Sequence, residues 1–308
     1  MLDLPPQPGP ARDAAILAYI KDGDYAVSWA EVTSTVGAHT GTFRVFADAL
    51  MIEGVRITMS AYLEQTVADM LGATLLTTKI ADLLYAQRVV TLQPHTQPAT
   101  SAMVGTAAMI AQSQWIDSQI AAAGSPQGII QTVGKSWVLT NGLLTHVNKA
   151  CNYGWHYNGT AFQGTVWPMS VTIPGVHVIQ NPGFAHADQE VDYSQNCVLV
   201  ARTCFVDGVS RDINDIFQDP TLSALVSAEG PLKILRQPGV PVSPFLGHSI
   251  PCVGPNCPTL VSYEPEEPER PSIPVVIAGG IALAATVGGF LGGLALLRPK
   301  RLRSRART

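Results

Sequence analysis

The feature that most constrains this chain is an uncharged apolar run near its C-terminus. Residues 272–297 read SIPVVIAGGIALAATVGGFLGGLALL and contain no charged side chain. About 20 such residues are enough to cross the hydrocarbon core of a bilayer. A buried helix of a soluble protein is the alternative, but the many glycines would destabilise a helix in water. We therefore predict a single transmembrane helix, which leaves the residues before it to form the folded body.

Small residues recur at every fourth position of this predicted span. They include Gly280, Ala284, Gly288 and Gly292. This spacing puts small side chains on one helix face and lets two spans approach closely. The sequence thus predicts the lipid bilayer as a partner, with a homo-oligomer through this face as a further hypothesis.

Charge is distributed unevenly along the chain. All 23 acidic residues precede residue 271, whereas six of the 19 basic residues lie in the tail at 298–308. The positive-inside tendency places this tail on the cytoplasmic or interior side and the body on the opposite side. The N-terminus lacks the basic start and apolar run of a signal peptide, so a tail-anchored cytosolic body stays open as an alternative. The acidic body argues against nucleic-acid binding, because phosphate contacts need a basic surface.

Composition divides the remaining chain into segments. Residues 1–12 are proline-rich and are expected to be irregular. Residues 13–235 are expected to form one globular domain, with a candidate sub-boundary near 90–106. Residues 236–271 are rich in proline and glutamate, which predicts an extended spacer between this domain and the span at 272–297.

Hydrophobic periodicity predicts helices in the first half of the globular domain and strands in the second. The expected class is therefore α+β, with a mainly antiparallel sheet. The expected helices are 13–21, 61–73, 79–88 and 112–123, followed by two short helices capped by Asp212 and Thr221. The expected strands are 42–52 and 55–59, which flank a tight turn, and then 136–141, 152–158, 176–180 and 198–206.

Polar and aromatic side chains concentrate in three clusters between residues 134 and 195. The clusters read GKSWVLTN, NYGWH and HADQEVDYSQ. In an extended strand alternate residues share one face, so His186, Asp188, Glu190 and Asp192 are expected together on one side. The structural alternative is the solvated face of an edge strand.

Two chemistries fit these residue types. His156, His186, Asp188 and Asp192 are candidate ligands for a divalent metal. Without a metal, His186 or His156 would be a general base oriented by Asp192, while Lys135 would stabilise developing negative charge. No HExxH or comparably specific spacing occurs, so the sequence leaves both alternatives open.

Other motifs are weaker. The GKS triplet is not a phosphate-binding loop, because Ile129 stands where that motif needs glycine. Ser194 lacks the small neighbours of a G-x-S-x-G elbow. Cys151 lies near His156 in sequence, but a nucleophile and its base must meet in space. Cys252 and Cys257 are candidates for a disulfide in an oxidising compartment.

The three clusters resemble a group of uncharacterised bacterial and phage-associated proteins. The shared ordered pattern is a Lys before V-x-T-N, then Y-G-W-H, then a His six residues before D-Y-S. The matching positions here are Lys135, 138–141, 153–156, His186 and 192–194. The resemblance spans about residues 15–235 and implies a common fold, with Lys135, His156, His186 and Asp192 in one site. It implies no activity.

This chain departs from the group at two places. Gly142 stands where relatives often have Arg, and Gln195 and Asn196 stand where they have His-Gly. A role that depends on those side chains is therefore not implied here.

Two functional hypotheses follow. The first is a membrane-anchored hydrolase that acts on cell-wall peptide or glycan through Lys135, His156, His186 and Asp192. The second is a non-catalytic virion or surface attachment protein in which the same residues form a hydrogen-bonded core network.

Overall fold

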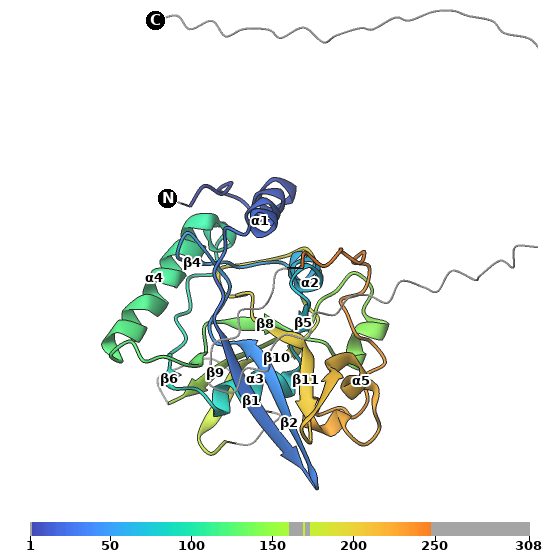
Figure 1. The fold of residues 1–308 in the computed structure, drawn as a ribbon. Helices are drawn as coiled ribbons and strands as arrows, with labels where there is room; N and C mark the ends of the chain where they lie inside the picture. The colour runs from blue at the N-terminus through green and yellow to red at the C-terminus, as the bar shows by residue number, and fades with distance from the viewer. Residues whose placement is uncertain (1, 160–168, 170–172, 248–308) are drawn as a thin grey trace, which may run out of the picture. The chain divides into compact units, whose positions relative to one another are not determined.

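The computed structural model describes residues 2–159, 169 and 173–247 (Figure 1). The chain divides into two compact units, Met1–Pro258 and Thr259–Thr308, and every described residue lies in the first. The predicted span at 272–297, the basic tail and most of the spacer fall outside the described residues. Within the described ranges, no helix has both the length and the apolar character needed to cross a bilayer.

The larger of two main sheets has five strands, and all of its pairings are antiparallel. Its strand order is β1-β2-β11-β12, with β5 also paired to β11. Phe43 and Val45 alternate into the core along β2, as expected for a sheet with one buried face. The strands are β1 (Trp29–Val36), β2 (His39–Phe46), β5 (Ala73–Leu75), β11 (Leu199–Val206) and β12 (Val209–Asp212).

The smaller sheet has three antiparallel strands in the order β10-β9-β8. These are β8 (Lys135–Trp137), β9 (Asn152–Asn158) and β10 (Val176–Gly183). Two short ribbons complete the β-structure: antiparallel β3 (Met51–Ile52) with β4 (Val55–Arg56), and parallel β6 (Val90–Thr91) with β7 (Ile130–Gln131). The class is α+β, as the sequence predicts.

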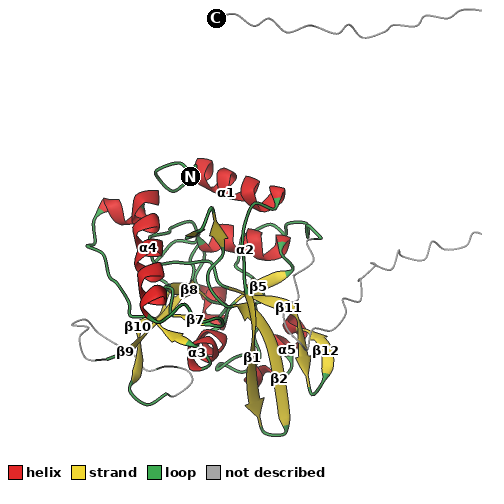
Figure 2. Cartoon of the chain, turned by 60° about the vertical axis from the view of Figure 1, so that its left-hand side comes forward, coloured by secondary structure: helices red, strands yellow, loops and turns green. Residues whose placement is uncertain are grey.

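Helix α3 lies between the two sheets, because it contacts β9 of the smaller sheet and β1 of the larger one (Figure 2). This position makes α3 the element that joins the two sheets. The helices are α1 (Pro10–Asp22), α2 (Ala61–Met70), α3 (Thr78–Ala86), α4 (Thr106–Ala122) and α5 (Ile213–Gln218), with 3-10 turns η1 (Ser101–Val104), η2 (Asn141–Thr145) and η3 (Ser223–Leu225).

Side-chain caps fix the starts of α2, α3 and α5, and the last of these caps, Asp212, is one that the sequence predicts. The Ser60 hydroxyl accepts from the Leu63 amide at α2. Thr77 does the same for Ile80 at α3, and the Asp212 carboxylate caps α5. Each cap satisfies an amide that the helix itself leaves unpaired and contributes about 1 kcal/mol.

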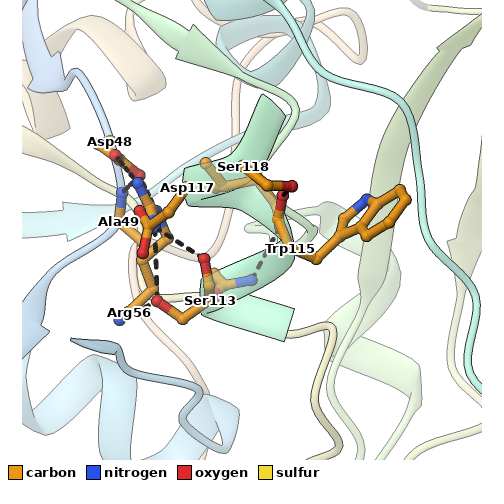
Figure 3. A network of polar contacts seen from close by, with 9 residues as sticks. Asp48, Ala49, Arg56, Ser113, Trp115, Asp117 and Ser118 are labelled. Carbon is orange, nitrogen blue, oxygen red and sulfur yellow. Dashed lines mark hydrogen bonds and ion pairs between the residues drawn. The ribbon is translucent and has the colours of Figure 1, made fainter. Parts of the chain in front are cut away.

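Arg56 holds α4 against the β3–β4 ribbon (Figure 3). Its guanidinium donates to both oxygens of Asp48, at 2.8 and 2.7 Å, and to Asp117 of α4 at 2.6 Å. Its backbone amide donates to the Ser113 hydroxyl. Burial lowers the pKa of Arg56, but the hydrogen bonds and negative charges of Asp48 and Asp117 together outweigh burial and raise it overall. The fork geometry suits a carboxylate partner.

Several sequence predictions differ from the structure, among them the strands expected over 55–59 and 136–141, which are only Val55–Arg56 and Lys135–Trp137. The strand expected over 42–52 begins at His39 and ends at Phe46, and its partner β1 is not among the expected strands. Helix α4 begins at Thr106 rather than 112. Thr221 caps nothing, since the Asp219 carboxylate accepts from the amides of Thr221 and its neighbour.

Candidate functional site

A buried histidine–aspartate pair lies where α3 packs on β9. His156 Nε2 is 2.7 Å from Asp82 Oδ1, and the two side chains are 2% and 0% exposed. The Tyr153 hydroxyl donates to the same oxygen at 2.8 Å. A carboxylate only accepts hydrogen bonds, so the imidazole proton lies on Nε2 and Nδ1 is left as an acceptor. This is the tautomer that a general base requires.

Within the residues that the structure describes, His156 Nδ1 has no hydrogen-bond partner. A Cβ added to Gly154 would lie 3.8 Å from this nitrogen. The Nδ1 edge of the ring therefore faces the place where any residue other than glycine would carry its side chain. Gly154 and Trp155 both have positive φ, at 105° and 56°. Such φ is uncommon for a bulky residue such as tryptophan, so Y-G-W-H is a distorted segment of β9 rather than regular strand.

An aromatic ring stacks on the imidazole, and a guanidinium stacks on that ring. The Tyr85 ring of α3 lies parallel to the His156 ring, with centroids 4.7 Å apart. The Arg88 guanidinium lies 3.8 Å from the Tyr85 ring centroid on the same stack. Burial raises the pKa of Tyr85, and the charge of Arg88 opposes this. Asp82 and Tyr85 together fix both the position and the plane of the imidazole.

Lys135 approaches the same part of β9 from the neighbouring strand. It lies directly opposite Gly154 in the β8–β9 pairing. Its ammonium is 5.6 Å from the centroid of the Trp155 ring. Burial lowers the pKa of Lys135, while the charge of Asp192 raises it. Lys135 and His156 therefore flank one distorted segment of β9.

Asp192 shapes a turn beside β8 and does not contact either histidine. Its Oδ1 accepts from the Ser194 amide at 2.7 Å and from the Ser194 hydroxyl at 2.5 Å. The Ser194 carbonyl accepts from the Lys135 amide. A Cβ on Gly134 would meet that carbonyl oxygen at 2.2 Å. The two backbone segments can therefore lie this close only with glycine at position 134. The hypothesis that Asp192 orients a histidine is wrong, because Asp82 takes that position for His156.

The expected alternating strand over 186–192 is also wrong. The segment is made of loops and turns, in which the Glu190 amide donates to the Ala187 carbonyl and the Glu190 carboxylate accepts from the Ala187 amide. These local hydrogen bonds form a turn, so alternate side chains of this segment do not share one face as they would in a strand. His186 Nδ1 lies 3.4 Å from Glu190 Oε2, and its ring meets the edge of Trp137. Asp188 is buried, and its carbonyl accepts from the Tyr62 amide.

The predicted metal set is not assembled. In the described part of the chain, no three His, Cys, Asp or Glu side chains gather as metal ligands would. His156 and His186 each have a different acidic partner, Asp82 and Glu190. Burial raises the pKa of the Cys151 thiol to about 12, so this thiol stays protonated at neutral pH and is a poor nucleophile.

The structure thus divides the four predicted site residues. His156 and Lys135 flank the same segment of β9, and Asp192 lies next to Lys135. His186 is separate from these three and lies at the start of the loop at 186–192. Sequence reasoning missed Asp82 and Tyr85. A signal was present in α3, where Asp82 is the only acidic residue and lies among the apolar residues Ile80, Leu83 and Leu84.

Taken together, the fold and the site define an α+β protein with a buried histidine base candidate held by a carboxylate. No protein-family model, curated protein or solved structure matches the chain.

Proposed function

We propose that this protein is a hydrolase in which His156, oriented by Asp82, is the general base. The observation that supports this most is the unpaired Nδ1 of His156, since Asp82 holds the opposite nitrogen at 2.7 Å. A buried nitrogen without a partner carries a desolvation cost. A water or hydroxyl proton donated to Nδ1 would remove that cost.

The reaction follows from three side chains. His156 Nδ1 takes a proton from water, whose oxygen attacks the scissile carbon. The Asp82 carboxylate then stabilises the imidazolium without accepting its proton. The Lys135 ammonium stabilises the oxyanion that forms on the substrate. The imidazolium finally returns the proton to the leaving group, which restores the starting state.

The proposed substrate is cell-wall peptide or glycan. This proposal is supported by the predicted spacer at 236–271 and the predicted span at 272–297, which suit a catalytic body tethered near a surface polymer. The resemblance to bacterial and phage-associated proteins at Lys135, His156, His186 and Asp192 agrees with a site in this region.

The test uses the full-length chain on cell-wall preparations, with release of soluble fragments as the measurement. His156→Gln keeps an amide donor for Asp82 but removes the base, and it is expected to lower the rate by about 10²-fold or more. Lys135→Met is expected to lower kcat more than it changes KM. Full activity in both variants would overturn the proposal.

The chain offers a matched control for these variants. His39 and Asp207 form a second pair with the same 2.7 Å separation, but this pair is exposed and joins the start of β2 to the β11–β12 turn. His39→Gln removes an identical side chain from an exposed pair and is expected to leave wall hydrolysis unchanged.

A second candidate function is a non-catalytic attachment protein. It is favoured by the burial of His156 and Asp82, at 2% and 0% exposure, which suits a hydrogen-bonded core network. In that case the wild-type protein releases no fragments, and His156→Gln lowers the free energy of unfolding without any enzymatic phenotype.

A further inference from the structure

A preformed cavity of about 400 Å³ lies beside the loop at 186–192. It is separate from the buried Asp82–His156 pair, neither of which lines it. Its walls combine apolar side chains with ionisable ones. The lining residues that matter here are Met103, Val104, His186, Glu190, Val191 and Asp192.

Hydrogen bonds from three sides fix the walls of this cavity. The Tyr193 amide donates to the Met103 carbonyl. The guanidinium of Arg12, from α1, donates to the Val104 carbonyl at 3.0 Å. The Thr106 amide donates to the Pro6 carbonyl, which holds the N-terminal segment in place. A pocket of this size, with walls held in place by hydrogen bonds, is typical of a ligand site.

Asp192 gives the cavity its chemistry. The residue is 6% exposed, and both hydrogen bonds that it accepts on its side chain go to Oδ1. In the ranges that the structure describes, no donor reaches Oδ2. The side chain is otherwise shielded, so Oδ2 is a charged acceptor at the cavity wall that remains available to a donor.

A second carboxylate stands at the rim. Glu190 is 61% exposed on its side chain and lies 3.4 Å from His186. Of the nearby cations, Arg12 is 1% exposed and its Nη1 is occupied by a backbone carbonyl. Lys135 interacts with Asp192 through its charge but does not line the cavity. The ionisable side chains that line the cavity are therefore two carboxylates, Asp192 and Glu190, and one imidazole, His186, and this set favours a cationic ligand over an anionic one.

We propose that this cavity binds a primary ammonium group carried on an aliphatic chain, as in a lysine side chain. The ammonium would donate to Asp192 Oδ2 and Glu190, while the methylene groups would pack on Met103, Val104 and Val191. An anionic ligand would face two carboxylates, and a purely apolar one would leave Oδ2 unpaired. The inference is independent of catalysis at His156, because it concerns binding and needs no turnover.

The experiment measures binding of Nα-acetyl-lysine amide to the full-length protein by calorimetry or ligand-observed NMR. The matched probe is Nα-acetyl-norleucine amide, which has the same aliphatic chain without the ammonium. The lysine probe is expected to bind at least about tenfold more tightly, as one charge-assisted hydrogen bond provides. Equal binding of the two probes, or no binding of either, would overturn the proposal.

Two variants assign the effect to the carboxylates. Asp192→Asn keeps an acceptor for Ser194 and is expected to reduce lysine binding to the norleucine level. Glu190→Gln keeps the acceptor for the Ala187 amide and is expected to weaken binding about threefold to tenfold. Because Glu190 is exposed, this variant tests the proposal even where Asp192→Asn fails to fold. Unchanged affinity in both folded variants contradicts the proposal.

Two further variants serve as controls. Glu31→Gln removes an exposed carboxylate on β1 and should leave the affinity for the lysine probe unchanged. His156→Gln should also retain it, so a failure of the proposed hydrolase can be distinguished from a failure of this binding site.

Discussion

Asp82 and His156 are 74 residues apart in sequence, yet Asp82 Oδ1 and His156 Nε2 are 2.7 Å apart in the fold. The pair connects α3 to β9, and α3 also contacts β1 of the larger sheet. One hydrogen bond therefore joins the candidate base to the helix that lies between the two sheets. Changes at this pair should affect stability as well as chemistry.

The first prediction concerns Asp82. Asp82→Asn removes the charge that favours the imidazolium, and leaves His156 and Tyr153 with a weaker acceptor. Leaving two buried donors with a weaker, neutral acceptor costs about 1–3 kcal/mol, so the free energy of unfolding in urea should fall by an amount of that order. Asp207→Asn alters the exposed pair with His39 and should change stability little. Equal losses of unfolding free energy in the two variants would contradict the expectation that the buried pair contributes more to stability than the exposed one.

The second prediction concerns Arg56. Arg56→Lys keeps a positive charge but loses the two-pronged contact with Asp48 and the bond to Asp117. We expect a loss of about 2–4 kcal/mol of unfolding free energy, with faster amide exchange in α4. As a comparison, Arg202→Lys in the half-exposed pair with Asp212 should cost under about 1 kcal/mol.

The third prediction contrasts two glycines. A Cβ on Gly134 would meet the Ser194 backbone carbonyl at 2.2 Å, whereas one on Gly142 would meet the Phe184 ring at 2.4 Å. The Ser194 backbone is held by the hydrogen bonds of its turn and cannot move aside, whereas the Phe184 ring can rotate. Gly134→Ala should therefore destabilise the protein by about 2 kcal/mol or more, and Gly142→Ala by less. Thermal denaturation of both variants measures the difference.

The fourth prediction is a pH dependence of stability. Burial raises the pKa of Glu64 well above its ordinary 4.5, and the Val198 backbone only partly opposes this. The folded state therefore holds a proton that the unfolded state releases. Stability from this group is fully present below pH 4.5 and is lost as the pH rises from there through the raised folded-state pKa.

Glu64→Gln tests this effect because it is neutral at every pH. The variant should gain stability relative to wild type as the pH rises from 5 to 8 in urea titrations. Glu31→Gln, at an exposed position, should show no such trend. Parallel curves for wild type and Glu64→Gln across this range would show that Glu64 is ionised in the folded state.

The fifth prediction concerns the apolar run. Deleting residues 272–308 should move the protein from the membrane fraction to the soluble fraction, because the run at 272–297 is long enough to cross a bilayer. Fractionation of the full-length and shortened chains measures this directly. A full-length chain found only in the soluble fraction would contradict the predicted span.

Local rules account for the elements that could be predicted from the sequence. Ser60, Thr77 and Asp212 mark the starts of α2, α3 and α5, since a cap bonds to an amide only two or three residues ahead. The strands at β9, β10 and β11 and the α+β class follow from short apolar runs between turn residues. Lys135 and His156 were likewise selected as candidate site residues from their neighbours in sequence.

Only the tertiary structure decided which side chains meet. The partner of His156 is Asp82 and not Asp192, because the packing of α3 on β9 sets that distance and no local pattern records it. The loop at 186–192 shows the same limit, since turn bonds between Ala187 and Glu190 override an alternation that predicts a strand. Contacts between distant segments depend on how whole elements pack, and one-dimensional periodicity carries no information about that packing.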